Sequence, residues 1–123
     1  MTRDEMKNLI ERLHSLWSTG DLMAIPTIYA PDFISHMSFT SGLGTLHGRS
    51  EVKEAIERVR HAVEGFTETI SDMIIDGDKV VTRYVCTGTH TPAGKPIRVN
   101  EISIYRVRDG LVAEQWCGRV VDD

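Results

Sequence analysis

The sequence has no long apolar run and no excess of basic residues. No stretch approaches the roughly 18 consecutive apolar residues that a membrane-spanning helix needs. Lysine and arginine total 14 against 18 aspartates and glutamates, which gives a net charge of −4. Both signs are scattered along the chain, so neither a nucleic-acid footprint nor a polybasic membrane patch is present. We therefore expect no nucleic-acid partner and no membrane association.

Cysteine is scarce, with only Cys86 and Cys117 in the chain. Both fall inside segments with strand patterns, and nothing else indicates an oxidising compartment. We expect buried free thiols and a cytoplasmic protein, with a disulfide as the alternative. The charged start Met1–Glu5 leads directly into an amphipathic pattern and lacks the apolar segment of a signal peptide.

The motifs of several enzyme classes are missing. The sequence contains no G-x-S-x-G nucleophile elbow, no Walker loop and no G-x-G-x-x-G after a strand pattern. Successive histidines are 22, 11, 14 and 29 residues apart, so no H-x-x-x-H pair offers two zinc ligands on one helix face. We expect no metal and no cofactor.

A length of 123 residues fits one domain, residues 1–123, with a single core and room for a pocket. Apolar residues recur at helical spacing over residues 4–18, where Asp4 is the expected N-cap and Gly20 the stop. A second, short helix is expected after Asp21 and extends to Tyr29. A short strand over residues 33–37 and a loop over residues 38–48 are expected to follow. A third helix is expected over residues 51–63, capped by Ser50.

From Phe66 onward the apolar period changes to two, which indicates strands. The predicted strands are residues 66–76, 79–91, 96–108 and 111–117, joined by short turns such as Asp76-Gly77-Asp78 and Asp109-Gly110. Helices followed by an antiparallel meander predict an α+β fold with the helices packed on one face of a curved sheet.

The predicted strands carry apolar residues on both faces, as Val80 and Val81 illustrate. An antiparallel sheet with one wet face alternates more cleanly than this. We therefore expect helices to cover one face and a second subunit to cover the other, which predicts a homodimer formed through the sheet.

An ordered series of short motifs follows this pattern through nearly the whole chain. Its members are Tyr29-Ala30-Pro31-Asp32-Phe33 with His36, Gly48, Asp76-Gly77-Asp78-Lys79-Val80-Val81, Gly88-Thr89-His90-Thr91, Tyr105-Arg106-Val107, Asp109-Gly110 and Glu114-Gln115-Trp116. The series resembles the SnoaL-like polyketide cyclases of the nuclear-transport-factor-two-like, or ketosteroid-isomerase-like, superfamily. The resemblance is fairly specific for the fold and less specific for an activity, because fold alone does not decide function.

The resemblance implies a cone-shaped α+β barrel with an apolar pocket between the helices and the concave sheet. It also implies cofactor-independent aldol cyclisation or isomerisation of an apolar carbonyl compound, with a carboxylate on the last strand as general acid/base. Relatives carry that acid a few residues past the tryptophan. Here those positions are Gly118 and Val120, and the first acid beyond them is Asp122.

Alternation on the strand predicted over residues 79–91 places Tyr84, Cys86, Gly88 and His90 on one face, and the resemblance implies that this face points into the cone. Gly88 fits a bend or a close approach. His90 is a candidate for proton transfer or for orienting a carbonyl, because an imidazole titrates near neutral pH. A histidine that only caps the strand end is the alternative.

On the last strand, Glu114 and Trp116 share one face, which we expect to be the inner one. Burial against Trp116 would raise the pKa of Glu114 and suit it to acid/base chemistry, but the carboxylate could instead pair with Arg98 or Arg106. Asp122 is a third candidate carboxylate, although chain ends are poorly fixed.

The ligand-binding candidates are His36, Tyr84, Trp116 and Tyr29, with core packing as the alternative for His36 and Trp116. His14 and His61 are interpreted as solvated or packing residues, and the role of His47 is open. Three hypotheses follow: a small-molecule enzyme using His90, Glu114 and Asp122; a non-catalytic ligand-binding domain; and a structural dimerisation module whose interior is filled by side chains.

Overall fold

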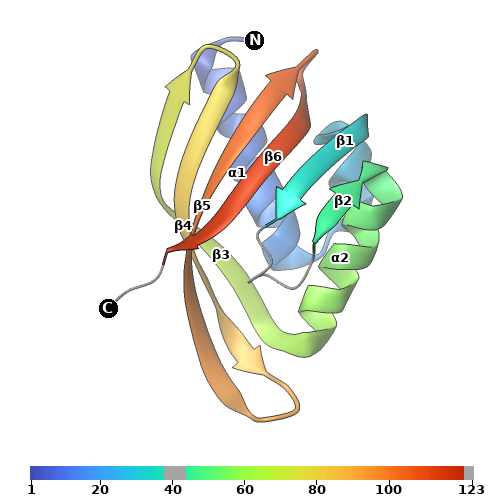
Figure 1. Ribbon diagram of the computed structural model, residues 1–123, viewed down its shortest axis with the longest axis vertical. Helices are drawn as coiled ribbons and strands as arrows, with labels where there is room; N and C mark the ends of the chain where they lie inside the picture. Colours follow the sequence, from blue (N-terminus) through green and yellow to red (C-terminus); the bar gives the residue numbers. More distant parts are fainter. Residues whose placement is uncertain (38–43, 121–123) are drawn as a thin grey trace.

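The computed structural model describes residues 1–37 and 44–120. Helices α1, η1 and α2 precede most of the sheet, and Figure 1 shows their arrangement. The elements are α1 (Arg3–Thr19), the 3-10 helix η1 (Leu22–Thr27), β1 (Tyr29–Met37), β2 (Thr45–His47), α2 (Gly48–Ala62), β3 (Val63–Asp76), β4 (Lys79–His90), β5 (Lys95–Arg108) and β6 (Leu111–Val120).

The six strands form one sheet in the order β2-β1-β6-β5-β4-β3. All neighbours are antiparallel except β1 and β6, which run parallel. The meander from β3 to β6 follows the predicted strands closely because its turns carry residues suited to tight reversals. Asp109 and Gly110 both have positive φ, of 53° and 78°, as a two-residue hairpin turn requires. The α+β class with a mainly antiparallel sheet is confirmed.

The structure corrects the expected helix caps. Thr2, not Asp4, caps α1: its hydroxyl accepts from the Glu5 amide, and the Glu5 carboxylate accepts from the Thr2 amide. Gly20 ends the helix in the left-handed conformation, as expected. Helix α2 begins at Gly48, so Ser50 lies inside its first turn, and the Glu51 side chain accepts from the His47 amide.

Two elements differ from the sequence pattern between the first and third helices. Tyr29 begins β1 instead of continuing the short helix, and strand β2 lies in a stretch expected to be a loop. The short strand β2 pairs with β1, where Ser35 lies opposite Leu46. This edge continues the sheet past β6 and gives α2 a surface to pack on.

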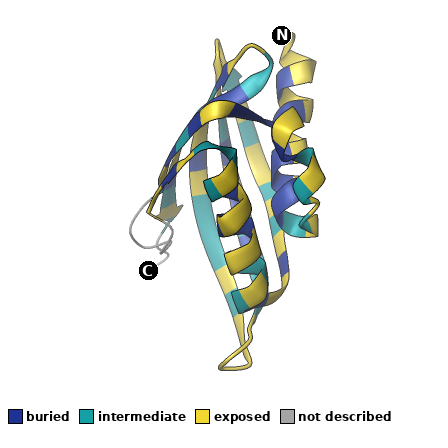
Figure 2. Cartoon of the chain, turned by 90° about the vertical axis from the view of Figure 1, so that its right-hand side faces the viewer, coloured by how far each residue is buried: buried dark blue, intermediate teal, exposed yellow. Residues whose placement is uncertain are grey.

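Both long helices cover the same face of the sheet, and Figure 2 shows their buried sides turned inward. Helix α1 packs on β3 and β4, whereas α2 packs on β1, β2 and β3. The buried side of α1 is the apolar stripe predicted from the sequence: Met6, Leu9, Ile10, Leu13, Leu16 and Trp17. Arg60 of α2 donates to the carbonyls of Trp17 and Ser18, which ties the two helices together at the end of α1.

Gly88 lies where β4 passes close to β3. A Cβ on Gly88 would lie 2.4 Å from Val63 Cγ1 and 3.0 Å from the Glu64 carbonyl oxygen. The pairing of β3 with β4 shifts register between Glu64 and Thr67, at this same point. The close approach expected at Gly88 is therefore confirmed.

Gly88→Ala is expected to lower the free energy of unfolding by about 1–3 kcal/mol, the usual cost of overpacking. Gly118→Ala is the matched control, because a Cβ there meets nothing within 4 Å, and we expect a change within about 0.5 kcal/mol. Urea unfolding of both variants measures the difference. Equal losses in the two variants would show that the contact with Val63 and Glu64 is not tight.

Candidate functional site

A cavity of about 280 Å³ lies between the helices and the inner face of the sheet. Most of its wall is apolar, and its apolar residues are Leu13, Trp17, Met37, Val59, Ala62, Val63, Phe66, Ile97 and Val99. Its volume is close to the lower end of the usual range for small-ligand pockets. The interior therefore contains a cavity near the size of a small-ligand pocket, and the hypothesis of a structural dimerisation module stays a prediction.

Polar side chains reach this cavity from four neighbouring strands. Inner-face positions of β3, β4, β5 and β6 supply Glu68, Tyr84, Glu101 and Gln115. Strand alternation explains the set, because residues two apart on one strand point to the same face. On β5 the inner positions include Val99, Glu101, Ser103 and Tyr105, so one carboxylate is placed in the middle of an otherwise apolar or hydroxyl-bearing row.

Glu101 is held by a chain of hydrogen bonds across the inner face. Tyr84 donates its phenolic proton to Glu101 Oε2 at 2.9 Å, and the Cys117 thiol donates to the same oxygen at 3.3 Å. Ser103 Oγ lies 2.9 Å from the Tyr84 oxygen and accepts from Gln115 Nε2 at 3.1 Å. The whole chain can run in one direction, from Gln115 through Ser103 and Tyr84 to the carboxylate, which fixes the orientation of Glu101.

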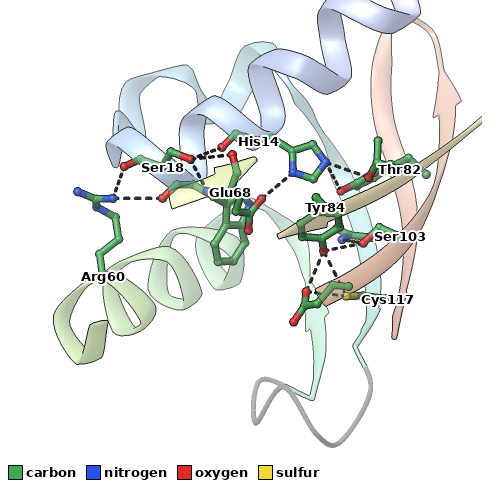
Figure 3. Close-up of polar contacts among 12 residues, drawn as sticks. His14, Ser18, Arg60, Glu68, Thr82, Tyr84, Ser103 and Cys117 are labelled. Atoms are coloured by element: carbon green, nitrogen blue, oxygen red, sulfur yellow. Dashed lines mark hydrogen bonds and ion pairs between the residues drawn. The ribbon is translucent and has the colours of Figure 1, made fainter. Parts of the chain in front are cut away.

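The second carboxyl group of the cavity, Glu68, is paired with a buried histidine (Figure 3). His14 Nδ1 lies 2.7 Å from Glu68 Oε1, and the two side chains are only 3% and 9% exposed. The other ring nitrogen, Nε2, lies 3.0 Å from the Tyr105 hydroxyl and 3.1 Å from Thr82 Oγ1. Because a carboxyl oxygen accepts from Nδ1–H, Nε2 is free to accept from one of these hydroxyls.

Ser18 anchors this pair between α1 and β3. The Glu68 amide donates to Ser18 Oγ at 2.8 Å, and the Ser18 hydroxyl donates to the His14 carbonyl at 3.1 Å. The backbone of Glu68 is therefore fixed to the helix that carries His14, as Figure 3 shows.

Burial changes the acidity of the groups around the cavity. It raises the pKa of Glu68, although the hydrogen bond from His14 opposes the rise. It also raises the pKa values of Tyr84 and Tyr105 well above the ordinary value of a tyrosine. For Cys117, burial raises the pKa to about 12. Both tyrosines and the thiol therefore stay protonated near neutral pH and act as hydrogen-bond donors.

Of the residues proposed from the sequence, Tyr84 lines the cavity, whereas Tyr29 contacts the cavity residue Trp17. Tyr29 is 1% exposed, and its hydroxyl accepts from Trp17 Nε1 at 2.9 Å, so it supports a wall residue and is not itself part of the lining. Cys86 and Cys117 are buried free thiols, as expected.

Glu114, Trp116 and His36 lie together on the opposite face of the sheet. The inner positions of β6 are Gln115 and Cys117, so the expectation that Glu114 and Trp116 face inward is wrong by one residue. His36 Nε2 lies 2.8 Å from Glu114 Oε2, and its ring stacks on Trp116 with centroids 5.6 Å apart. Hydrogen bonds from His36 and Arg106 lower the pKa of Glu114 instead of raising it.

The other two catalytic candidates, His90 and Asp122, are not among the described residues that line the cavity. His90 is exposed at the end of β4, opposite Lys95, and is not part of the cavity lining. Asp122 lies outside the described residues. The structure therefore separates His90 from Glu114, which the sequence interpretation had joined in one site.

The sequence interpretation missed His14, Glu68 and Glu101. His14 follows Ile10 by four residues and precedes Trp17 by three, so it shares the buried stripe of α1. Glu101 is the single acid on the inner parity of β5, and Glu68 lies two residues after the buried Phe66 on β3. The sequence did carry a signal for these residues: each is a polar residue at a position where the apolar pattern predicts burial.

Neither a metal cluster nor a membrane-spanning helix is found in the part of the chain that the structure describes. Over residues 1–37 and 44–120, no three histidine, cysteine or acidic side chains gather closely enough to hold a metal ion. Over the same ranges, no helix combines the length and apolarity needed to cross a membrane.

Solved structures resemble this chain over most of its length. A candidate polyketide cyclase from Bacillus cereus is 30% identical with a TM-score of 0.82, and the match covers 97% of this chain and 78% of that one. IdmH from Streptomyces antibioticus, also described as a candidate polyketide cyclase, is 28% identical with a TM-score of 0.81, covering 92% and 90%. TsrD from Streptomyces laurentii, 22% identical with a TM-score of 0.84 and coverage of 97% and 90%, shares the fold.

No curated protein matches the chain. The family model of the SnoaL-like domain matches residues 10–115, which include both carboxyl groups of the cavity and every element except the first turns of α1 and the end of β6. The TM-scores of 0.81 and 0.82 to the solved candidate polyketide cyclases agree with this match. The chain therefore belongs to the SnoaL-like domain family.

Proposed function

We propose that this protein binds an apolar carbonyl compound in the cavity and catalyses proton transfer on it without a cofactor, in an aldol cyclisation or an isomerisation. The observation that carries the proposal is that two carboxyl groups with different partners, Glu68 and Glu101, line one apolar cavity. When two carboxyl groups lie in unlike environments, one can hold its proton and act as the acid while the other stays ionised and acts as the base.

Glu101 is the proposed general base. Its contacts with Tyr84 and Cys117 both involve Oε2, so the carboxylate is oriented by groups that stay protonated. In the proposed step, Glu101 takes a proton from the carbon next to the substrate carbonyl, and the electron pair of that C–H bond forms the enol double bond. General-base catalysis of this kind contributes typically 10²–10⁴-fold to a rate.

Glu68, supported by His14, is the proposed acid. Because burial raises its pKa, Glu68 can hold a proton that an exposed glutamate would release. This proton passes to the carbonyl oxygen as the enol forms. His14 acts as a positioning residue, because its Nδ1 holds Glu68 Oε1 and leaves the other carboxyl oxygen for the substrate.

The proposal is tested by exchange of substrate protons for deuterium. The small bicyclic ketone 2-tetralone, incubated in D2O with the protein, is expected to lose its α-proton NMR signals faster than in buffer alone. The alternative function, ligand binding without catalysis, predicts saturable binding of the ketone in calorimetry with exchange at the buffer rate. The sequence-based assignment of His90, Glu114 and Asp122 to catalysis stays a prediction, and the same assay on variants of these residues tests it.

We also propose that the chain forms one domain and assembles as a homodimer through the outer face of the sheet. Three large apolar side chains remain 37–39% exposed there: Ile102, Ile104 and Trp116. Together with His36 they line one groove. Contiguous apolar surface of this kind on a sheet favours burial against a second copy.

Trp116→Glu is expected to convert the dimer to a monomer, because it places one charge from each copy in the apolar interface. Light scattering after gel filtration measures the mass, with 13.8 kDa expected for the monomer. Ile74→Glu is the control, since Ile74 is 58% exposed on β3 and does not line this groove. A wild-type protein that is monomeric at high concentration would contradict the proposal.

A further inference from the structure

Two arginines line the cavity from opposite layers of the fold. Arg58 comes from α2 and Arg119 from β6, and both line the cavity although both are exposed. A side chain that is exposed and also lines a cavity lies at its mouth. The positive charge of Arg119 reaches the wall, where it opposes the rise in the pKa of the buried Cys86 thiol.

Neither guanidinium is engaged within the described part of the chain. The ion pairs and side-chain hydrogen bonds there include neither Arg58 nor Arg119. By contrast, Arg49 and Arg60 both hold backbone carbonyls, and Arg106 and Arg108 pair with acids. The chain as a whole carries a net charge of −4, so two unpaired cations at one opening form a local exception.

We propose that the substrate is an apolar carboxylic acid whose carboxylate binds Arg58 and Arg119 at the mouth while its carbonyl-bearing end lies deep in the cavity. Guanidinium groups suit this role because their donors match the two oxygens of a carboxylate. Glu68 is buried beside His14. Glu101 lies opposite Arg119 in the pairing of β5 with β6, and its carboxylate would repel a second anion. Charge thus orients the molecule, and its apolar body lies against residues such as Trp17 and Phe66.

The inference rests on the proposed function, which decides that the carbonyl-bearing end of the substrate is the end that reacts. The test of the inference measures binding and requires no turnover. Calorimetry would compare three naphthalene compounds of similar size: 2-naphthylacetate, its neutral amide 2-naphthylacetamide, and the cationic 2-(2-naphthyl)ethylamine. We expect the acid to bind about tenfold more tightly than the amide, as one charge-assisted interaction provides, and the amine to bind most weakly.

Arg58→Gln and Arg119→Gln are each expected to remove most of the tenfold preference for the acid. Arg98→Gln is the matched control, because it makes the same change in net charge on the outer face of β5 and should keep the preference. Equal binding of acid and amide, or tighter binding of the amine, would overturn the inference.

The two proposals fail in different ways. Exchange of 2-tetralone protons at the buffer rate, together with a preserved preference for the acid, would overturn the proposed reaction and leave the substrate class in place. Normal exchange without any preference for the acid would overturn only the substrate class.

Discussion

Glu101→Gln should lower the rate of α-proton exchange from 2-tetralone by about 10²–10⁴-fold, the usual contribution of a general base. Glutamine keeps the shape of glutamate and can still accept a hydrogen bond from Tyr84 through its amide oxygen. It cannot take a proton from carbon. The fold and the affinity for the ketone should therefore change little, while the exchange rate falls.

Two further glutamine variants make this result specific. Glu54 lies on the exposed side of α2, so the Glu54→Gln variant should exchange the protons of 2-tetralone at the wild-type rate. Glu114→Gln tests the sequence-based candidate: it lies on the outer face with His36 and Arg106, so we expect near wild-type exchange. If Glu114→Gln loses exchange and Glu101→Gln keeps it, the reacting groups are on the other face of the sheet.

Removal of His14 should cost more stability than any other single change considered for this protein. His14→Leu leaves the buried Glu68 carboxyl group without its hydrogen-bond donor and removes the Nε2 partner of the Tyr105 and Thr82 hydroxyls. An unsatisfied buried polar group costs about 1–3 kcal/mol, so the loss of two or more such bonds should total about 3–5 kcal/mol. For a domain whose total stability is of the order of 5–15 kcal/mol, that is a large share. Urea unfolding at neutral pH measures the loss.

The double variant His14→Leu, Glu68→Met separates pairing from packing. It removes both polar partners and keeps similar volumes, so it should recover much of the stability lost in the single variant. A loss below about 1 kcal/mol for His14→Leu, as for an exposed ion pair, would contradict the buried pairing. So would a double variant as unstable as the single one.

The pH dependence of stability gives an independent check on Glu68. Because the folded-state pKa of Glu68 is raised, the folded protein holds a proton that the unfolded chain has already released. The stabilisation that Glu68 contributes is fully present below the pKa that Glu68 has in the unfolded chain. It is lost as the pH rises through the pKa that Glu68 has in the folded protein. Glu68→Gln should therefore flatten the fall in unfolding free energy above the ordinary range of glutamate, and an unchanged slope would show that the raised pKa is wrong.

The meander could be predicted from the sequence because its information is local. The period of two after Phe66 and the turns at Gly77, Gly94 and Gly110 define each hairpin without reference to the rest of the chain. The apolar stripe of α1 is local in the same sense. The short strand β2 has only three residues and exists through its pairing with β1, so no local pattern indicated it.

The inner face of β6 could not be predicted because alternation separates two faces without saying which one is buried. Placing the largest side chain, Trp116, inside was the natural choice, and it moved Glu114 inside with it. The strand instead buries Gln115 and Cys117. A shift of one residue exchanges every side chain between the faces, which is why one wrong assignment displaced two candidate site residues.

The functional groups of the cavity depend on contacts between distant segments. His14 and Glu68 are 54 residues apart and meet only when α1 packs on β3. Glu101 joins Tyr84 across neighbouring strands. Their positions in buried patterns could be recognised in the sequence, whereas their pairing could not.

A crystal structure of the protein soaked with 2-tetralone would show whether the cavity holds the reacting ketone. We expect the ketone in the cavity between the helices and the sheet, with its oxygen within hydrogen-bond distance of Glu68 and its α-carbon facing the Glu101 carboxylate. Binding of the ketone in the outer groove beside Trp116, with the cavity unoccupied at saturating ketone, would contradict it.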